Sequence, residues 1–177
     1  MTIDTARRLP TEAEEARFWE LIESAWAACG PDVAPLREAL VARDPALDGD
    51  ADGLYALDAW LDHFLANLRR LSAGLSSAEL TDLDRVAERK LHDLDRDEIH
   101  EHTDGSDDGF LYCRGFIVAV GREFYLAVNT DPSLAVLDAD CEQMCYFFAR
   151  LHAERFGNYP DTGSGISRES GTNPNGW

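Results

Sequence analysis

The sequence has few basic residues. Only 16 Lys and Arg stand against 34 Asp and Glu, so the 177-residue chain carries a formal net charge of −18. A nucleic-acid binder needs a basic face for the phosphates, and this composition argues against that class of partner. Hydrophobic runs are also too short to span a bilayer, and residues 1–15 contain no apolar secretion signal. We therefore expect a cytoplasmic protein that binds neither nucleic acid nor membranes.

Cysteine is sparse and scattered, at Cys29, Cys113, Cys141 and Cys145. Without a secretion signal, these residues are most simply interpreted as small buried hydrophobes rather than disulfide partners. Apolar residues make up 45% of the chain, which is enough to build a core at this length. The sequence predicts one helical domain over residues 1–157.

Two capping boxes and several apolar stripes predict helices. Thr11 with Glu14, and Ser76 with Glu79, have the spacing at which side chains satisfy the first free amides of a helix. Apolar residues recur every three or four positions after both boxes, and also over residues 54–71 and 141–151. A weaker helix is expected over 35–43. The predicted fold is mainly α, a compact bundle of five or six helices.

Residues 110–128 allow two interpretations. The aromatic and β-branched residues on either side of Gly121 suit a short hairpin, which would make the fold α+β. Ser106, followed by Asp107 and Asp108, instead provides a good helix start. The residues alone leave helix and hairpin open.

The last twenty residues, 158–177, are rich in Gly, Pro, Asn, Ser and Thr and have no periodicity. They predict an irregular C-terminal arm. Trp177 is then either exposed or docked in a groove. Arg168 and Glu169, within this arm, are candidate partner-binding residues if the arm orders on binding.

One set of motifs resembles a known family. Ser106-Asp107-Asp108-Gly109-Phe110 is followed by Arg114-Gly115, Gly121-Arg122-Glu123 and Asp131-Pro132-Ser133-Leu134. With the aromatic and acidic start Phe18 to Glu23, this pattern resembles a bacterial family known as domain of unknown function 4240 (DUF 4240), most specifically over residues 106–134. The resemblance implies a mostly helical fold and supplies no activity.

The resemblance marks Asp107, Asp108, Arg114 and Arg122 as a candidate ligand-binding or partner-binding set. Adjacent helical residues diverge by about 100°, so the two aspartates need not face one site. First-turn carboxylates also stabilise a helix N-terminus, and this structural role is the favoured interpretation. No catalytic residue is predicted.

A second candidate lies in the acidic segment 92–108. His100, His102 and Asp104 have the residue types that bind a divalent metal ion, and such a site would suit a metal-dependent hydrolase. Charge runs are more often solvated surface, so we predict no metal or cofactor and keep the metalloenzyme as the alternative. The family resemblance does not extend to these histidines.

The leading functional hypothesis is a non-enzymatic binding or regulatory protein. Its acidic surface would bind a basic protein or cationic ligand, as in an immunity-type or regulatory role. Imitation of nucleic acid by the acidic surface is a further hypothesis, which only the charge supports.

Overall fold

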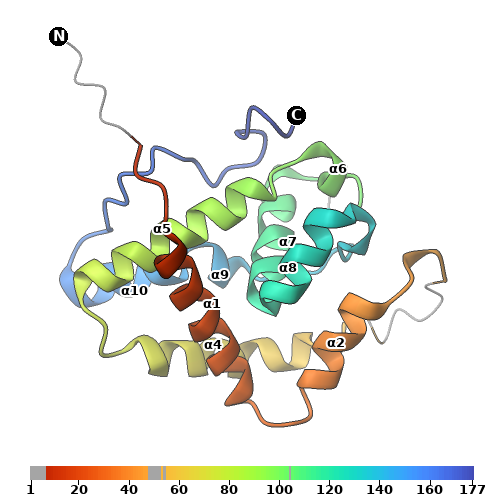
Figure 1. Cartoon of the computed structure of the whole chain (residues 1–177), viewed down its shortest axis with the longest axis horizontal. Helices are drawn as coiled ribbons and strands as arrows, with labels where there is room; N and C mark the ends of the chain where they lie inside the picture. Colours follow the sequence, from red (N-terminus) through yellow and green to blue (C-terminus); the bar gives the residue numbers. More distant parts are fainter. Residues whose placement is uncertain (1–6, 48–52, 54, 104) are drawn as a thin grey trace.

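The computed structural model describes residues 7–47, 53, 55–103 and 105–177, and over these residues the chain is mainly helical (Figure 1). The predicted mainly α fold is therefore confirmed. The elements are α1 (Glu12–Ala27), α2 (Ala34–Ala42), η1 (Pro45–Leu47), α4 (Asp58–Ser72), α5 (Ser77–Asp93), α6 (Asp97–His100), α7 (Asp107–Val120), α8 (Arg122–Thr130), η2 (Pro132–Leu134), α9 (Glu142–Cys145) and α10 (Phe147–Phe156).

Both predicted capping boxes form. The Thr11 hydroxyl accepts the Glu14 N–H, while the Glu14 carboxylate accepts the Thr11 N–H at 2.8 Å. Ser76 and Glu79 make the same reciprocal bonds at the start of α5. Local side chains therefore fix where α1 and α5 begin, as the sequence predicts.

Residues 110–128 form two helices and no hairpin. The Ser106 hydroxyl accepts the Gly109 N–H and caps α7, whose first turn carries Asp107 and Asp108. Gly121 separates α7 from α8 with φ 122°, a conformation that favours glycine. The cap and this break resolve the ambiguity in favour of helix.

The core lies where α1 packs between α4 and α5, and where α7 packs against α5, α8 and α9. Trp26 of α1 stacks on Phe64 of α4 with ring centroids 4.4 Å apart, and its indole N–H donates to the Ala119 carbonyl of α7. Gly115 of α7 meets α9 so closely that a Cβ there would lie 2.5 Å from the Cys141 oxygen. Cys113, Cys141 and Cys145 are buried, whereas Cys29 is partly exposed.

The stripe over residues 141–151 is not one helix. Tyr146, with φ −128° and ψ 14°, separates α9 from α10, so the prediction of a continuous helix is wrong. Gly157 ends α10 in the left-handed conformation, as expected of a C-terminal glycine.

The C-terminal arm, residues 158–177, lies along α5 and ends beside α6 (Figure 1). It has irregular structure throughout, as predicted. The Arg8 N–H donates to the Gly163 carbonyl, and the Asp97 N–H donates to the Gly176 carbonyl. The arm is therefore tied to the N-terminal segment at one end and to α6 at the other. Among the described helices, none has both the length and the apolar character that a membrane crossing needs.

Candidate functional site beneath the C-terminal arm

The arm is fastened to α5 by a buried ion pair. Arg168 Nη2 lies 2.6 Å from Asp84 Oδ2 and 3.3 Å from Glu88 Oε1, and all three side chains are largely removed from solvent. Asp84 and Glu88 are four residues apart, so they share one face of α5. Arg168 also donates to the Cys145 carbonyl, which adds α9 to the contact.

Burial and the opposite charge of the partner shift the pKa values of Asp84 and Arg168 in opposite directions. Burial raises the pKa of Asp84, and Arg168 compensates only in part. Burial also works to lower the pKa of Arg168, but Asp84 and Glu88 outweigh it and raise that pKa. A buried carboxylate of this kind depends on its partner, because an unpaired buried charge is strongly destabilising.

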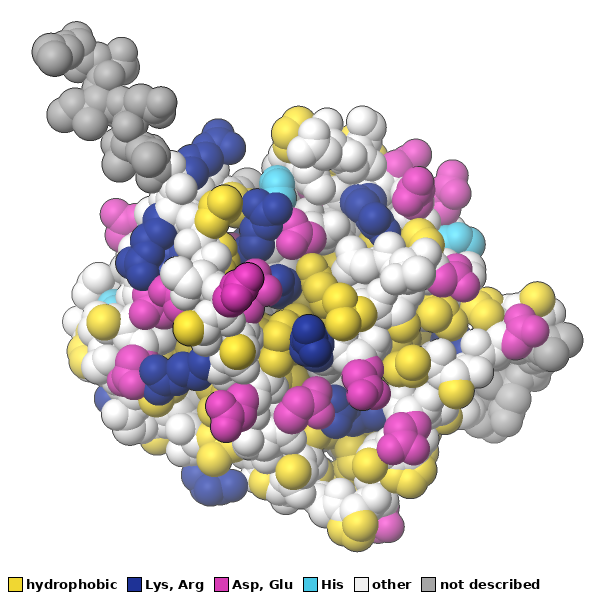
Figure 2. Space-filling model, in the orientation of Figure 1, with side chains coloured by type: hydrophobic (Ala, Val, Ile, Leu, Met, Phe, Trp, Pro, Cys, Tyr) yellow, Lys and Arg dark blue, Asp and Glu magenta, His cyan; other side chains and the backbone are white. Residues whose placement is uncertain are grey.

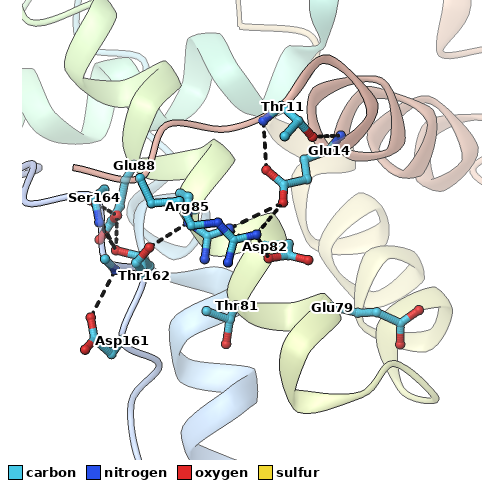
Figure 3. Close-up of polar contacts among 12 residues, drawn as sticks. Thr11, Glu14, Glu79, Thr81, Asp82, Arg85, Glu88, Asp161, Thr162 and Ser164 are labelled. Carbon is cyan, nitrogen blue, oxygen red and sulfur yellow. Dashed lines mark hydrogen bonds and ion pairs between the residues drawn. The ribbon is translucent and has the colours of Figure 1, made fainter. Parts of the chain in front are cut away.

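A second group of contacts joins the arm to α5 and α1 (Figure 3). Glu88 accepts hydrogen bonds from the hydroxyls of Thr162 at 2.6 Å and Ser164 at 2.7 Å. The buried Arg85 donates to the Thr162 carbonyl at 2.6 Å and to Asp82 at 2.7 Å, and lies 3.5 Å from Glu14. Arg85 thus links the capping box of α1 to the arm.

Asp95, just after α5, holds the end of the arm. Its carboxylate accepts the backbone N–H groups of Gly171, Thr172 and Asn173 at 2.8–2.9 Å and the Trp177 indole N–H at 3.0 Å. Burial works to raise the pKa of Asp95, but the backbone donors and Arg114 together hold it below its ordinary value. Trp177 is partly docked, since its indole N–H is bonded while the residue remains 51% exposed.

Arg114 is the member of the predicted set that lies in this region. It is fully buried in α7 and donates to the Leu91 and Arg168 carbonyls at 2.8 and 3.0 Å, and to the Ser170 hydroxyl at 3.0 Å. Burial lowers its pKa, which the nearby Asp95 carboxylate partly opposes. The structure therefore brings Arg114 of α7 against the backbone of Arg168 on the underside of the arm.

The other members of the predicted set lie apart from this contact. Asp107 and Asp108 are exposed, and only the Asp107 carbonyl reaches the arm, where it accepts the Ser170 hydroxyl. Glu169, which with Arg168 is a separate candidate on the arm, accepts a 3.4 Å hydrogen bond from the Tyr146 hydroxyl. Arg122 lines a different cavity, together with Glu23 and Arg37. The set is therefore divided among three places.

The two histidines of the metal hypothesis, His100 and His102, lie in different surroundings. The His100 ring packs against Phe110 and Trp177, with centroids 4.8 and 5.4 Å away. His102 is exposed and lines a cavity with Asp131. Asp104 lies outside the described residues. Within the part of the chain that the structure describes, no three His, Cys, Asp or Glu side chains gather to hold a metal ion.

Sequence reasoning missed the residues that organise the arm. Asp84 lies on the apolar stripe of α5, four residues after Leu80, and a carboxylate on such a face is a signal of a buried partner. Nothing in the sequence indicates the contact between Ser77 and His152. The Ser77 hydroxyl lies 2.7 Å from His152 Nε2, and His152 Nδ1 lies 2.6 Å from the Asn158 carbonyl, which ties the start of the arm to α5.

No family model matches this chain, and no curated protein or solved structure matches it either. The resemblance to DUF 4240 stays a prediction. The arrangement itself places and holds the arm, because its ionic groups are buried against each other rather than presented to a solute.

Proposed function

We propose that this chain is a non-enzymatic binding protein whose acidic surface binds a basic partner in the cytoplasm. The surface in question is formed by α6 and the first turn of α7, and we refer to it as the α6 acidic surface. Its members are the exposed side chains of Asp97, Glu98, Glu101, Asp107 and Asp108. Figure 2 shows acidic side chains gathered at the upper right, in the region where Figure 1 places α6.

The observation that supports this proposal is which charged side chains form ion pairs within the molecule and which do not. Most basic side chains are used within the molecule. Ion pairs with carboxylates are formed by Arg8, Arg17, Arg37, Arg69, Arg85, Arg89, Lys90, Arg150 and Arg168. The carboxylates of the α6 acidic surface make no ion pair with any described residue, so their charge is left for an external cation.

A surface of this kind acts mainly on recognition and on the rate of association. Neighbouring carboxylates create a negative potential that steers a basic partner and disfavours acidic competitors. Exposed charges are screened over about 8 Å at physiological ionic strength, so the association must weaken as salt is added.

The test is to cross-link cellular proteins to the purified chain, identify a captured basic protein, and measure its binding again with both proteins pure. The first variant carries Asp97→Asn, Glu98→Gln and Glu101→Gln. The matched control carries Glu20→Gln, Asp32→Asn and Glu38→Gln, three exposed carboxylates without an ion pair to a described residue. Both variants change the net charge by the same amount.

We expect the first variant to lose most of its affinity and the control to keep it, with the wild-type affinity falling steeply as salt is added. Equal weakening of both variants would show that only net charge matters. No captured basic partner, or one indifferent to salt, would overturn the proposal.

A further inference from the structure

A cavity of about 590 Å³ lies beside the arm. Its walls are the last turns of α5, Arg96 just after them, Arg7 and Leu9 of the N-terminal segment, and two stretches of the arm, 164–167 and 172–175. Cavities that hold small molecules in proteins measure about 300–1,000 Å³, so this one is large enough for a ligand.

The cavity is basic in an otherwise acidic protein. Arg7, Arg89 and Arg96 line it together with His92, and Asp93 is its one carboxylate. Figure 2 shows basic side chains gathered at the upper left, over the N-terminal segment and α5. Ser167 also lines the cavity and carries a hydroxyl group, whereas the hydroxyl of Thr172, another lining residue, donates to the Glu169 carbonyl at 2.7 Å.

Some guanidinium N–H groups of these arginines donate no hydrogen bond to the described part of the chain. Arg89 Nε binds Asp93 at 2.8 Å, and its two terminal nitrogens make no hydrogen bond there. Arg96 gives one terminal nitrogen to the Asn129 carbonyl at 3.2 Å. Arg7 makes no ion pair with any described residue. The three arginines among the lining residues therefore keep guanidinium nitrogens that no described group binds.

We propose that this cavity binds a small molecule through a phosphate group. Guanidinium forks match phosphate oxygens and can donate two parallel hydrogen bonds, and a hydroxyl group adds a neutral donor. A phosphate ion would fill only part of the volume, so the ligand carries a further group that contacts the apolar part of the lining, such as Leu9 and Ile166. This inference does not rest on the α6 acidic surface or on a basic partner.

The strong net negative charge does not prevent this binding. Exposed carboxylates farther away than about 8 Å are screened by salt, whereas groups that line the cavity act at contact distance. Asp93 is the exception, because it lies within the cavity and competes with the ligand for Arg89. Removal of its charge must therefore tighten phosphate binding.

Isothermal titration calorimetry of the full chain tests the proposal with inorganic phosphate, pyrophosphate, adenosine diphosphate and uncharged adenosine. We expect the phosphate-bearing probes to bind and adenosine not to bind at the same concentration. Arg89→Gln and Arg96→Gln should each weaken binding about 10- to 100-fold, the loss expected for a charge-assisted hydrogen bond. Asp93→Asn should strengthen it.

The matched control is Arg70→Gln, which removes one positive charge from an exposed position outside the cavity. It should bind as the wild type does. Arg7→Gln, at an exposed position of the lining, gives a second test that does not depend on a buried contact of α5. No heat with any phosphate probe at millimolar concentration, or equal weakening by Arg70→Gln, would overturn the proposal.

Discussion

Arg168 of the C-terminal arm and Asp84 of α5 are separated by 84 residues in the chain, yet Arg168 Nη2 lies 2.6 Å from Asp84 Oδ2 in a buried contact. Around it, Arg85, Glu88 and Arg114 reach the arm through further hydrogen bonds. An irregular segment thereby becomes part of the folded structure. Polar contacts rather than an apolar stripe determine where it lies.

The first prediction concerns this pair. Arg168→Met leaves Asp84 buried without its cation, so we expect the free energy of unfolding to fall by about 3–5 kcal/mol. The double variant Asp84→Leu/Arg168→Met should lose less, because the buried Asp84 carboxylate is removed together with its cation and Glu88 keeps its hydrogen bonds from Thr162 and Ser164. Urea denaturation of both variants measures the difference.

The control is Arg150→Met, which removes an exposed ion pair with Glu142. Such pairs contribute about 0–1 kcal/mol. A loss in Arg168→Met no larger than that in Arg150→Met would show that the buried pair does not hold the arm.

The second prediction is that acid releases the end of the arm. The pKa of Asp95 in the folded chain lies below its ordinary value of 3.8, so the carboxylate stabilises the fold above that value. This contribution is lost as the pH falls below 3.8 through the lowered pKa. The amides of Gly171, Thr172 and Asn173 should then lose protection relative to their intrinsic exchange rates at the same pH, which hydrogen-exchange mass spectrometry detects on the arm peptide.

Asp95→Asn should show fast exchange in the same peptide at neutral pH, because the amide oxygen is a weaker acceptor than a carboxylate. Its stability should also depend less on pH in the acid range. An unchanged acid dependence in this variant would assign the effect to another carboxylate.

Local signals explain why much of the helical fold could be predicted. Thr11 with Glu14 and Ser76 with Glu79 depend on neighbours three residues away, so the sequence shows these helix starts directly. The break at Tyr146 could not be seen, because the apolar spacing continues across it. The spacing of apolar residues therefore predicts that a segment is helical, but it does not predict where the helix axis breaks.

The placement of the arm could not be predicted for a different reason. Asp95 meets the arm through backbone N–H groups 76 to 78 residues later, and any residue type other than proline supplies such a donor. Arg114 and Arg168 were named as candidates, yet their shared location depends on how α7 packs against α5. The acid at position 84 on an apolar stripe was the one available signal.

The third prediction concerns the contact of α7 with α9. A Cβ on Gly115 would lie 2.5 Å from the Cys141 carbonyl oxygen and 2.6 Å from Cys145 Sγ. Since the carbonyl is backbone and cannot simply rotate away, Gly115→Ala should destabilise the fold by about 1–3 kcal/mol. Gly74→Ala, where a Cβ meets nothing within 4 Å, should stay within about 0.5 kcal/mol of the wild type in the same denaturation experiment.

The last prediction is that the four thiols differ in reactivity. Burial raises the pKa of both Cys141 and Cys145 to about 12, so neither forms much of the reactive thiolate at neutral pH. Cys113 is also buried, whereas Cys29 is partly exposed. Brief treatment of the native chain with iodoacetamide should therefore modify Cys29 first, as read by peptide mass spectrometry.

The variant Cys29→Ser should take up almost no label until denaturant is added. Labelling of Cys141 or Cys145 as fast as Cys29 in the native chain would mean that α9 opens readily, and that the close contact with Gly115 does not hold it in place.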